Sequence, residues 1–148
     1  MTEDRIERDI LIEAPLAHVW TLVAQPGFWV GEEIDLPGTV AVEGETTTAR
    51  NATYGDFPVR VVKTEPPSYL AYRWASAFPG EQPGDGNSTL IEFTLTEEGT
   101  GTRLKVVESG FATLAGGPEL RGRALEDNTG GWQQVFDAFK KRAEQSAT

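Results

Sequence analysis

Residues 128–145 read NTGGWQQVFDAFKKRAEQ, and this stretch predicts a long C-terminal helix. Its large apolar side chains recur at i, i+3, i+4 and i+7, which places them on one face of a helix. They are Trp132, Val135, Phe136 and Phe139. Asn128 or Thr129 is expected to cap the helix, because a side-chain oxygen at that place accepts a backbone N–H of the first turn. Such a helix needs an apolar surface to cover.

The sequence before this helix predicts an antiparallel sheet that provides the surface. Five segments are rich in β-branched or aromatic residues and are bounded by Gly, Pro or Asn. They are Thr46–Tyr54, Phe57–Lys63, Tyr69–Ala75, Thr89–Thr96 and Thr102–Ser109. Because most connectors are short, successive strands are expected to pair as a meander. Only Phe78–Asn87, which is rich in Gly and Pro, is longer, and we expect a loop there.

The N-terminal part predicts one more strand and two short helical pieces. Arg5–Glu13 alternates apolar and charged side chains, as a half-buried strand does. Pro15 suits the first residue of a helix that runs to about Ala24. One helical turn is expected at Phe28–Val30. Near the other end, Glu119–Asp127 forms either a partial helix or an ordered loop.

Composition bounds the size of the fold and excludes several functions. The 148 residues are expected to form a single α+β domain, 1–148. The net charge of −10 disfavours nucleic acid and membrane surfaces as partners. Without Cys and with one His, the chain offers no thiolate nucleophile and no His pair for a metal. It has no phosphate-binding loop, so no cofactor is expected. With neither a signal peptide nor a membrane span, a cytoplasmic location is expected.

Five short fragments, taken in order, carry a family resemblance. They are Ile10–Pro15, Val19-Trp20, Thr64–Pro67 leading to Leu70–Trp74, Gly101–Leu104 and Gly130–Trp132. Together they resemble the Hsp90-ATPase-activator-homologue branch of the START-like, Bet v 1-like superfamily, over nearly the whole chain. The resemblance implies a helix-grip fold, in which a curved antiparallel sheet wraps around the long C-terminal helix and two short helices follow the first strand. It also implies an apolar cavity between sheet and helix.

Nine large aromatic side chains are candidates to line such a cavity, because large aromatics commonly line small-molecule sites. They are Trp20, Tyr54, Phe57, Tyr72, Trp74, Phe93, Phe111, Trp132 and Phe136. The alternative is that they fill the core. Regular helix spacing favours the core for Trp20, Trp132 and Phe136. Tyr72 and Trp74 carry polar groups and suit either role.

Two charged residues, Arg8 and Glu108, interrupt apolar strand faces. If the first and last strands pair, as the resemblance implies, the two side chains lie within reach of each other. They then form a buried or cavity-facing ion pair that orients a polar group of a ligand. The alternative, which we favour, is that both lie near strand ends and extend to water.

Three functions are compatible with these features. The first is a non-enzymatic module that binds a small hydrophobic or aromatic molecule between sheet and C-terminal helix. The second, implied by the resemblance, is an interaction protein whose partner is an Hsp90-type chaperone. The third is an enzyme, since related helix-grip proteins include polyketide cyclases and aromatases; Arg8, Tyr72 and Glu108 are its candidate groups. No Ser, Cys or His arrangement supports nucleophilic catalysis, so no catalytic residue is predicted and we expect a binder.

Overall fold

The computed structural model describes residues 5–25, 29, 42–51, 55–75, 78, 81–84, 86–111 and 114–146. Two helices and six strands lie along these residues. In chain order they are β1 (Arg5–Ile12), α1 (Leu16–Val23), β2 (Thr46–Asn51), β3 (Gly55–Glu65), β4 (Tyr69–Trp74), β5 (Thr89–Glu98), β6 (Gly101–Ser109) and α2 (Pro118–Ser146). Each predicted strand is present. The predicted helical turn at Phe28–Val30, except Trp29, and the end of the segment Thr46–Tyr54 lie outside the described residues.

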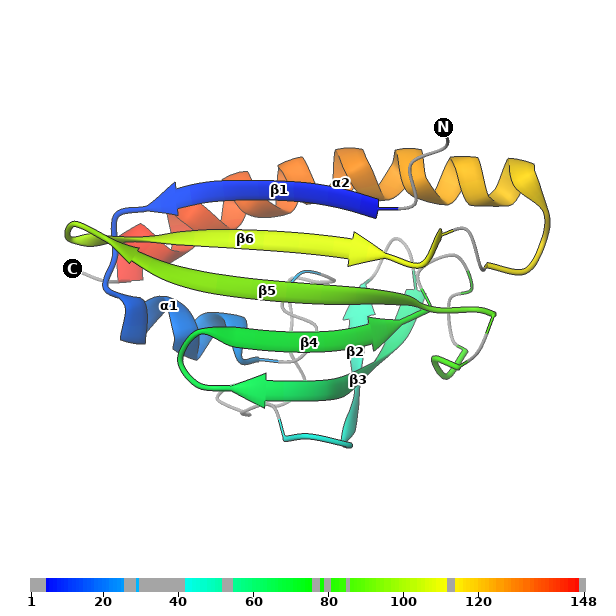
Figure 1. The fold of residues 1–148 in the computed structure, drawn as a ribbon, viewed down its shortest axis with the longest axis horizontal. Helices are drawn as coiled ribbons and strands as arrows, with labels where there is room; N and C mark the ends of the chain where they lie inside the picture. The colour runs from blue at the N-terminus through cyan, green and yellow to red at the C-terminus, as the bar shows by residue number, and fades with distance from the viewer. Residues whose placement is uncertain are drawn as a thin grey trace.

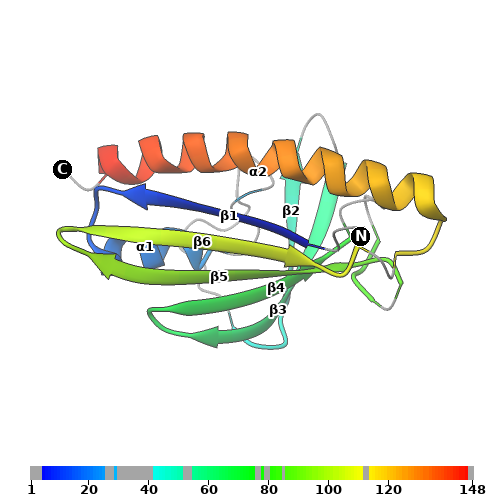
Figure 2. The same ribbon diagram turned by 45° about the horizontal axis from the view of Figure 1, so that its top comes forward.

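The six strands form one antiparallel sheet in the order β1-β6-β5-β4-β3-β2. The long helix α2 runs beside β1 and β6 (Figure 1). The sheet curls, so that β2 and the adjoining end of β3 turn across the direction of β5 and β6 (Figure 2). The inward side chains of the strands and the apolar faces of α1 and α2 form one buried core. This arrangement confirms the predicted α+β helix-grip fold.

Helix α2 begins much earlier than the predicted cap. It starts at Pro118, a residue that suits the first turn because its missing N–H needs no partner there. Of the two possibilities for Glu119–Asp127, the helix is therefore present. The cap prediction is wrong, because Asn128 and Thr129 lie inside the helix. Thr129 donates its hydroxyl to the carbonyl of Leu125 at 2.6 Å, and the Asn128 amide donates to a buried carboxylate on β6.

Two adjacent glycines, Gly130 and Gly131, occupy the middle of α2. A Cβ atom added at either position meets nothing within 4 Å. We therefore expect Gly130→Ala to raise the free energy of unfolding by about 0.5–1 kcal/mol in urea denaturation, since Ala loses less backbone entropy in a helix. Gly101→Ala is the control that should destabilise, because its Cβ would lie 2.7 Å from the carbonyl oxygen of Ile12. A destabilised Gly130→Ala protein would contradict a continuous α2.

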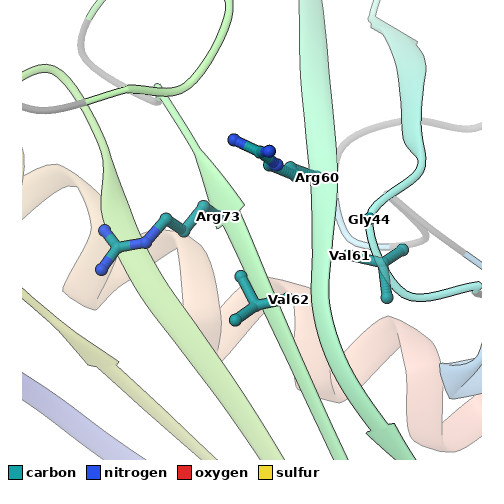
Figure 3. A pocket seen from close by; sticks show the side chains of 5 residues that line it. All are labelled: Gly44, Arg60, Val61, Val62 and Arg73. Atoms are coloured by element: carbon teal, nitrogen blue, oxygen red, sulfur yellow. The ribbon is translucent and has the colours of Figure 1, made fainter.

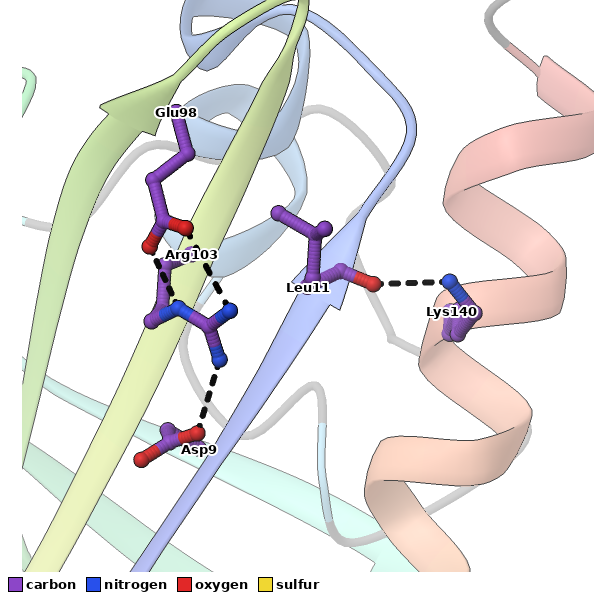
Figure 4. A network of polar contacts seen from close by, with 5 residues as sticks. All are labelled: Asp9, Leu11, Glu98, Arg103 and Lys140. Carbon is purple, nitrogen blue, oxygen red and sulfur yellow. Dashed lines mark hydrogen bonds and ion pairs between the residues drawn. The ribbon is translucent and has the colours of Figure 1, made fainter.

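Polar contacts fix the C-terminal half of α2 against the end of β1 (Figure 4). Lys140 Nζ donates to the carbonyl of Leu11 at 2.7 Å and to Glu144 Oε2 at 2.7 Å. Glu144 Oε2 also accepts the backbone N–H of Glu13 at 2.8 Å. The hydrogen bonds from Lys140 and from Glu13 lower the pKa of Glu144. The edge strand β1 is thus held between α2 and β6.

Arg103 adds ion pairs on the other face of the sheet. Its guanidinium group binds Glu98 at the end of β5, and its Nη1 lies 2.9 Å from Asp9 Oδ1 on β1 (Figure 4). All three side chains are exposed. Surface pairs of this kind contribute little stability, so the apolar core carries most of it.

Candidate functional site

The most unusual group in the interior is the carboxylate of Glu108, which is 0% exposed. Glu108 lies near the end of β6, and four side chains donate hydrogen bonds to it. To Oε2, Trp74 Nε1 of β4 donates at 2.8 Å and Thr89 Oγ1 of β5 at 2.6 Å. To Oε1, Trp132 Nε1 of α2 donates at 2.7 Å, and Asn128 Nδ2 lies 3.2 Å from Oε1 and 3.1 Å from Oε2. We call these five residues the Glu108 network.

The Glu108 network contains donors but no cation. Among the described residues, no Lys, Arg or His forms an ion pair with Glu108. Removal from water raises the pKa of Glu108 above its ordinary value of 4.5, while the four hydrogen bonds act in the opposite direction. Desolvation is the larger effect. Within the part of the chain that the structure describes, the charge of the carboxylate is therefore balanced by neutral dipoles.

An aromatic cluster lies against the Glu108 network. We define it as Trp29, Phe57, Tyr72, Trp74, Phe93, Trp132 and Phe136. Trp29 is central, with ring centroids 5.0 Å from Tyr72, 5.7 Å from Trp74 and Phe93, and 6.1 Å from Trp132. Most pairs are tilted or edge-to-face, the arrangements that aromatic quadrupoles favour. Trp74 and Trp132 belong to both groups, so the carboxylate sits at the border of an aromatic interior.

Tyr72 connects this interior to helix α1. Its hydroxyl donates to the carbonyl of Val23, the last residue of α1, at 3.0 Å. The ring is fully buried, and burial raises the pKa of Tyr72 well above its usual 10. Tyr72 therefore stays neutral and acts as a hydrogen-bond donor.

The structure brings together most of the residues that were predicted from the sequence as candidate site residues. Six of the nine aromatic candidates are in the aromatic cluster, and Glu108 contacts two of these six. Phe111 is buried in the core, and Trp20 is half-buried on α1 and packs against the core. Tyr54 lies outside the described residues.

The ion pair between Arg8 and Glu108, one of the two possibilities that the sequence left open, is not formed among the described contacts. Arg8 is exposed on the edge strand β1, where its Nη1 donates to the carbonyl of Glu7 at 2.8 Å. In the register, Arg8 lies opposite Val106, whereas Glu108 lies opposite Ile6. The alternative, in which both extend to water, describes Arg8 but is wrong for Glu108. Donors from three other elements satisfy Glu108, so it needs neither Arg8 nor solvent.

The sequence analysis did not predict Trp29, Thr89 or Asn128 as site residues. For Asn128 a signal existed, because it lies four residues before Trp132 and so on the same face of one helix. Its preference for helix caps hid this signal. Nothing in the sequence around Trp29 or Thr89 indicates that they meet the other residues of the site.

The fold and site define a class: an α+β helix-grip protein with a polar group in an aromatic interior. Residues 13–144 match the family of activator of Hsp90 ATPase homolog 1-like proteins, and the chain belongs to this family. The predicted resemblance is thereby confirmed. No curated protein matches the chain.

Several solved structures share the fold. Protein MLL2253 from Mesorhizobium loti has a TM-score of 0.74 and 22% identity, with 97% of this chain and 99% of that protein covered. The Aha1 dimer from Colwellia psychrerythraea has a TM-score of 0.70 and 18% identity, with 96% and 97% covered. DynU16, from the dynemicin biosynthetic locus, has a TM-score of 0.73 and 22% identity over 99% of this chain. This chain spans 49% of DynU16, about half its length. Identities this low establish the fold alone.

In the described part of the chain, neither helix has the length and hydropathy needed to cross a membrane.

Proposed function

We propose that this protein binds a small hydrophobic or aromatic molecule between the sheet and α2, and that Glu108 accepts a hydrogen bond from that molecule. The supporting observation is the buried carboxylate, which has four neutral donors and no cation among the described residues. Burying a carboxylate costs several kcal/mol, and packed apolar residues would stabilise the same core at least as well. Buried groups with a shifted pKa gather at functional sites.

The surroundings of Glu108 indicate which ligand chemistry fits. Aromatic rings offer flat apolar surface, and the carboxylate accepts N–H or O–H donors. A planar apolar molecule with one hydroxyl or amine group would use both. Its donor would most easily replace that of Asn128, whose contacts at 3.1 and 3.2 Å are the longest in the Glu108 network. Because the cluster rings are 5.0–6.1 Å apart and touch one another, binding requires some of them to move.

A thermal-unfolding screen against flavonoids, polyketide-like aromatics, fatty acids and sterols tests this proposal. A ligand at about 100 times its dissociation constant adds roughly 2.7 kcal/mol, which raises Tm by several degrees. We expect hits among planar hydroxylated compounds and shifts of the indole N–H resonances of Trp74 and Trp132. The matched ligand control is the O-methylated compound, which lacks the donor and should bind about tenfold more weakly. A panel without hits, or shifts confined to the surface, would contradict the proposal.

Family membership favours one alternative, contact with an Hsp90-type chaperone. Stimulation of a bacterial Hsp90 ATPase by the full chain would support it, and absence of both binding and stimulation would remove it.

Glu108 also bears on the enzymatic alternative, because it is a titratable group deep in the interior. Loss of turnover of a bound ligand in a folded Glu108→Gln protein would favour an enzyme over a binder. Each of these activities would take place in the cytoplasm.

A further inference from the structure

A feature of the outer face of the sheet, away from α2, is separate from the interior site. It is a hollow of about 310 Å³ lined by Gly44, Arg60, Val61, Val62 and Arg73 (Figure 3). The two arginines come from the neighbouring strands β3 and β4, and Gly44 comes from the turn before β2. None of these residues belongs to the Glu108 network or the aromatic cluster. The hollow is therefore independent of the interior site.

A bulge in β3 and a tight turn shape the hollow. The pairing of β3 with β4 shifts between Val61 and Lys63, so Val62 is an extra residue. Bulges redirect side chains and are frequent beside functional sites. The turn is fixed to β3, since Gly44 N donates to the carbonyl of Val61 at 2.8 Å and Val61 N donates to the carbonyl of Glu45 at 2.9 Å. Gly44 has φ +87°, a conformation that favours glycine.

Two like charges lie on neighbouring strands at this hollow. Arg60 and Arg73 lie directly opposite in the register, and both are exposed. Like charges in that position repel. Neither arginine forms an ion pair with a described carboxylate, whereas Lys63, Arg103 and Lys105 on the same face each do. In a protein with a net charge of −10, two adjacent arginines without such a counter-charge attract an anion.

Apolar surface adjoins the two arginines. Val62 is 43% exposed, and Val42, two residues before Gly44, is 50% exposed. They are the two exposed large hydrophobic residues in the part of the chain that the structure describes. The hollow thus combines two guanidinium groups, which bind carboxylate or phosphate oxygens through paired N–H donors, with an uncovered apolar side chain.

We propose that this hollow binds a small amphiphilic oxyanion, a carboxylate or phosphate joined to an apolar group. Arg60 and Arg73 hold the oxygens, and Val62 contacts the apolar part. The bound anion lies between the two like charges and offsets their repulsion. The volume of the hollow is at the lower end of the range for small-molecule sites, so a short ligand fits it best.

The test is an NMR titration of the full chain at low salt with two probes, hexanoate and hexyl phosphate. We expect saturable shifts at the amides of Gly44 and Val62 and at the guanidinium Nε–H groups of Arg60 and Arg73. The stronger probe identifies the preferred oxyanion. Arg60→Gln and Arg73→Gln should each raise Kd about three- to fivefold, and the double variant should remove saturation. Added salt should weaken binding, because both charges are exposed.

The control variant is Arg103→Gln, an exposed cation of the same face that is already paired with Asp9 and Glu98. It should change Kd by less than about twofold. Neutral hexanamide should give no saturable shift. Equal responses to hexanamide and hexanoate, or an unchanged Kd in the double variant, would overturn the proposal. Shifts at the indole of Trp132 instead of Gly44 would also overturn it, and would assign the probes to the interior site.

Discussion

Replacement of Glu108 by alanine is expected to lower the free energy of unfolding by about 3–5 kcal/mol, a large part of a stability that is typically about 5–15 kcal/mol. The change leaves the indole N–H groups of Trp74 and Trp132 and the amide of Asn128 without their acceptor. Each buried donor that loses its acceptor costs about 1–3 kcal/mol. Urea denaturation at neutral pH, followed by Trp fluorescence, measures the loss.

Two further variants make this result interpretable. Glu108→Gln keeps the shape and one acceptor oxygen but turns an N–H₂ group toward the donors, so an intermediate loss of about 1–3 kcal/mol is expected. Glu97→Ala removes an exposed carboxylate from the neighbouring strand β5 and should change stability by less than about 0.5 kcal/mol. If Glu108→Ala were as stable as Glu97→Ala, Glu108 would not be the centre of a buried network.

Trp132→Ala should lower the free energy of unfolding by a similar amount, about 3–5 kcal/mol. The change removes a 2% exposed indole from the aromatic cluster, and with it one of the hydrogen bonds that Glu108 accepts. Trp132→Phe removes mainly the donor and should cost about 1–3 kcal/mol. Gln134→Ala, on the exposed face of α2, is the matched control and should stay within about 0.5 kcal/mol of the unchanged protein.

The loss of stability caused by Trp132→Phe should also depend on pH. The folded-state pKa of Glu108 lies above 4.5, so its contribution to stability falls as pH rises from about that value through the folded pKa. Losing one donor to the anion raises the folded pKa further. The Phe variant should therefore lose more stability, relative to the unchanged protein, at pH 8 than at pH 5. Denaturation curves across this range test the sign. A larger loss at pH 5 would mean that the indole does not stabilise the charged form.

Local patterns predicted the fold well because each element repeats its signal over many residues. Alternation indicated the first strand, and richness in β-branched or aromatic residues indicated the other five. The apolar spacing from Trp132 to Phe139 indicated the helix. The start of α2 was missed because Asn128, Thr129 and two glycines disfavour a helix interior locally. Packing of the preceding turns, where Ala124 is buried against the core, outweighs that local preference.

The site was only partly predictable. Glu108 could be singled out because a carboxylate on an apolar strand face is unusual, but its partners come from β4, β5 and α2. Their meeting depends on the strand register and on the rotation of α2, which no local pattern encodes. Arg8 likewise interrupts an apolar strand face in the sequence, yet it lies on an edge strand, where its guanidinium group reaches water.

The pairing of β1 with β6 has a consequence for synthesis on the ribosome. Residues 5–12 are translated well before residues 102–109, which are their hydrogen-bonding partners. Until then Ile6 and Ile12, both buried in the finished sheet, remain uncovered on the nascent chain. Contacts this distant in sequence also slow folding. Among the six described strands, β1 therefore waits longest for its partner, and its apolar face is open to chaperone capture and to aggregation during that interval.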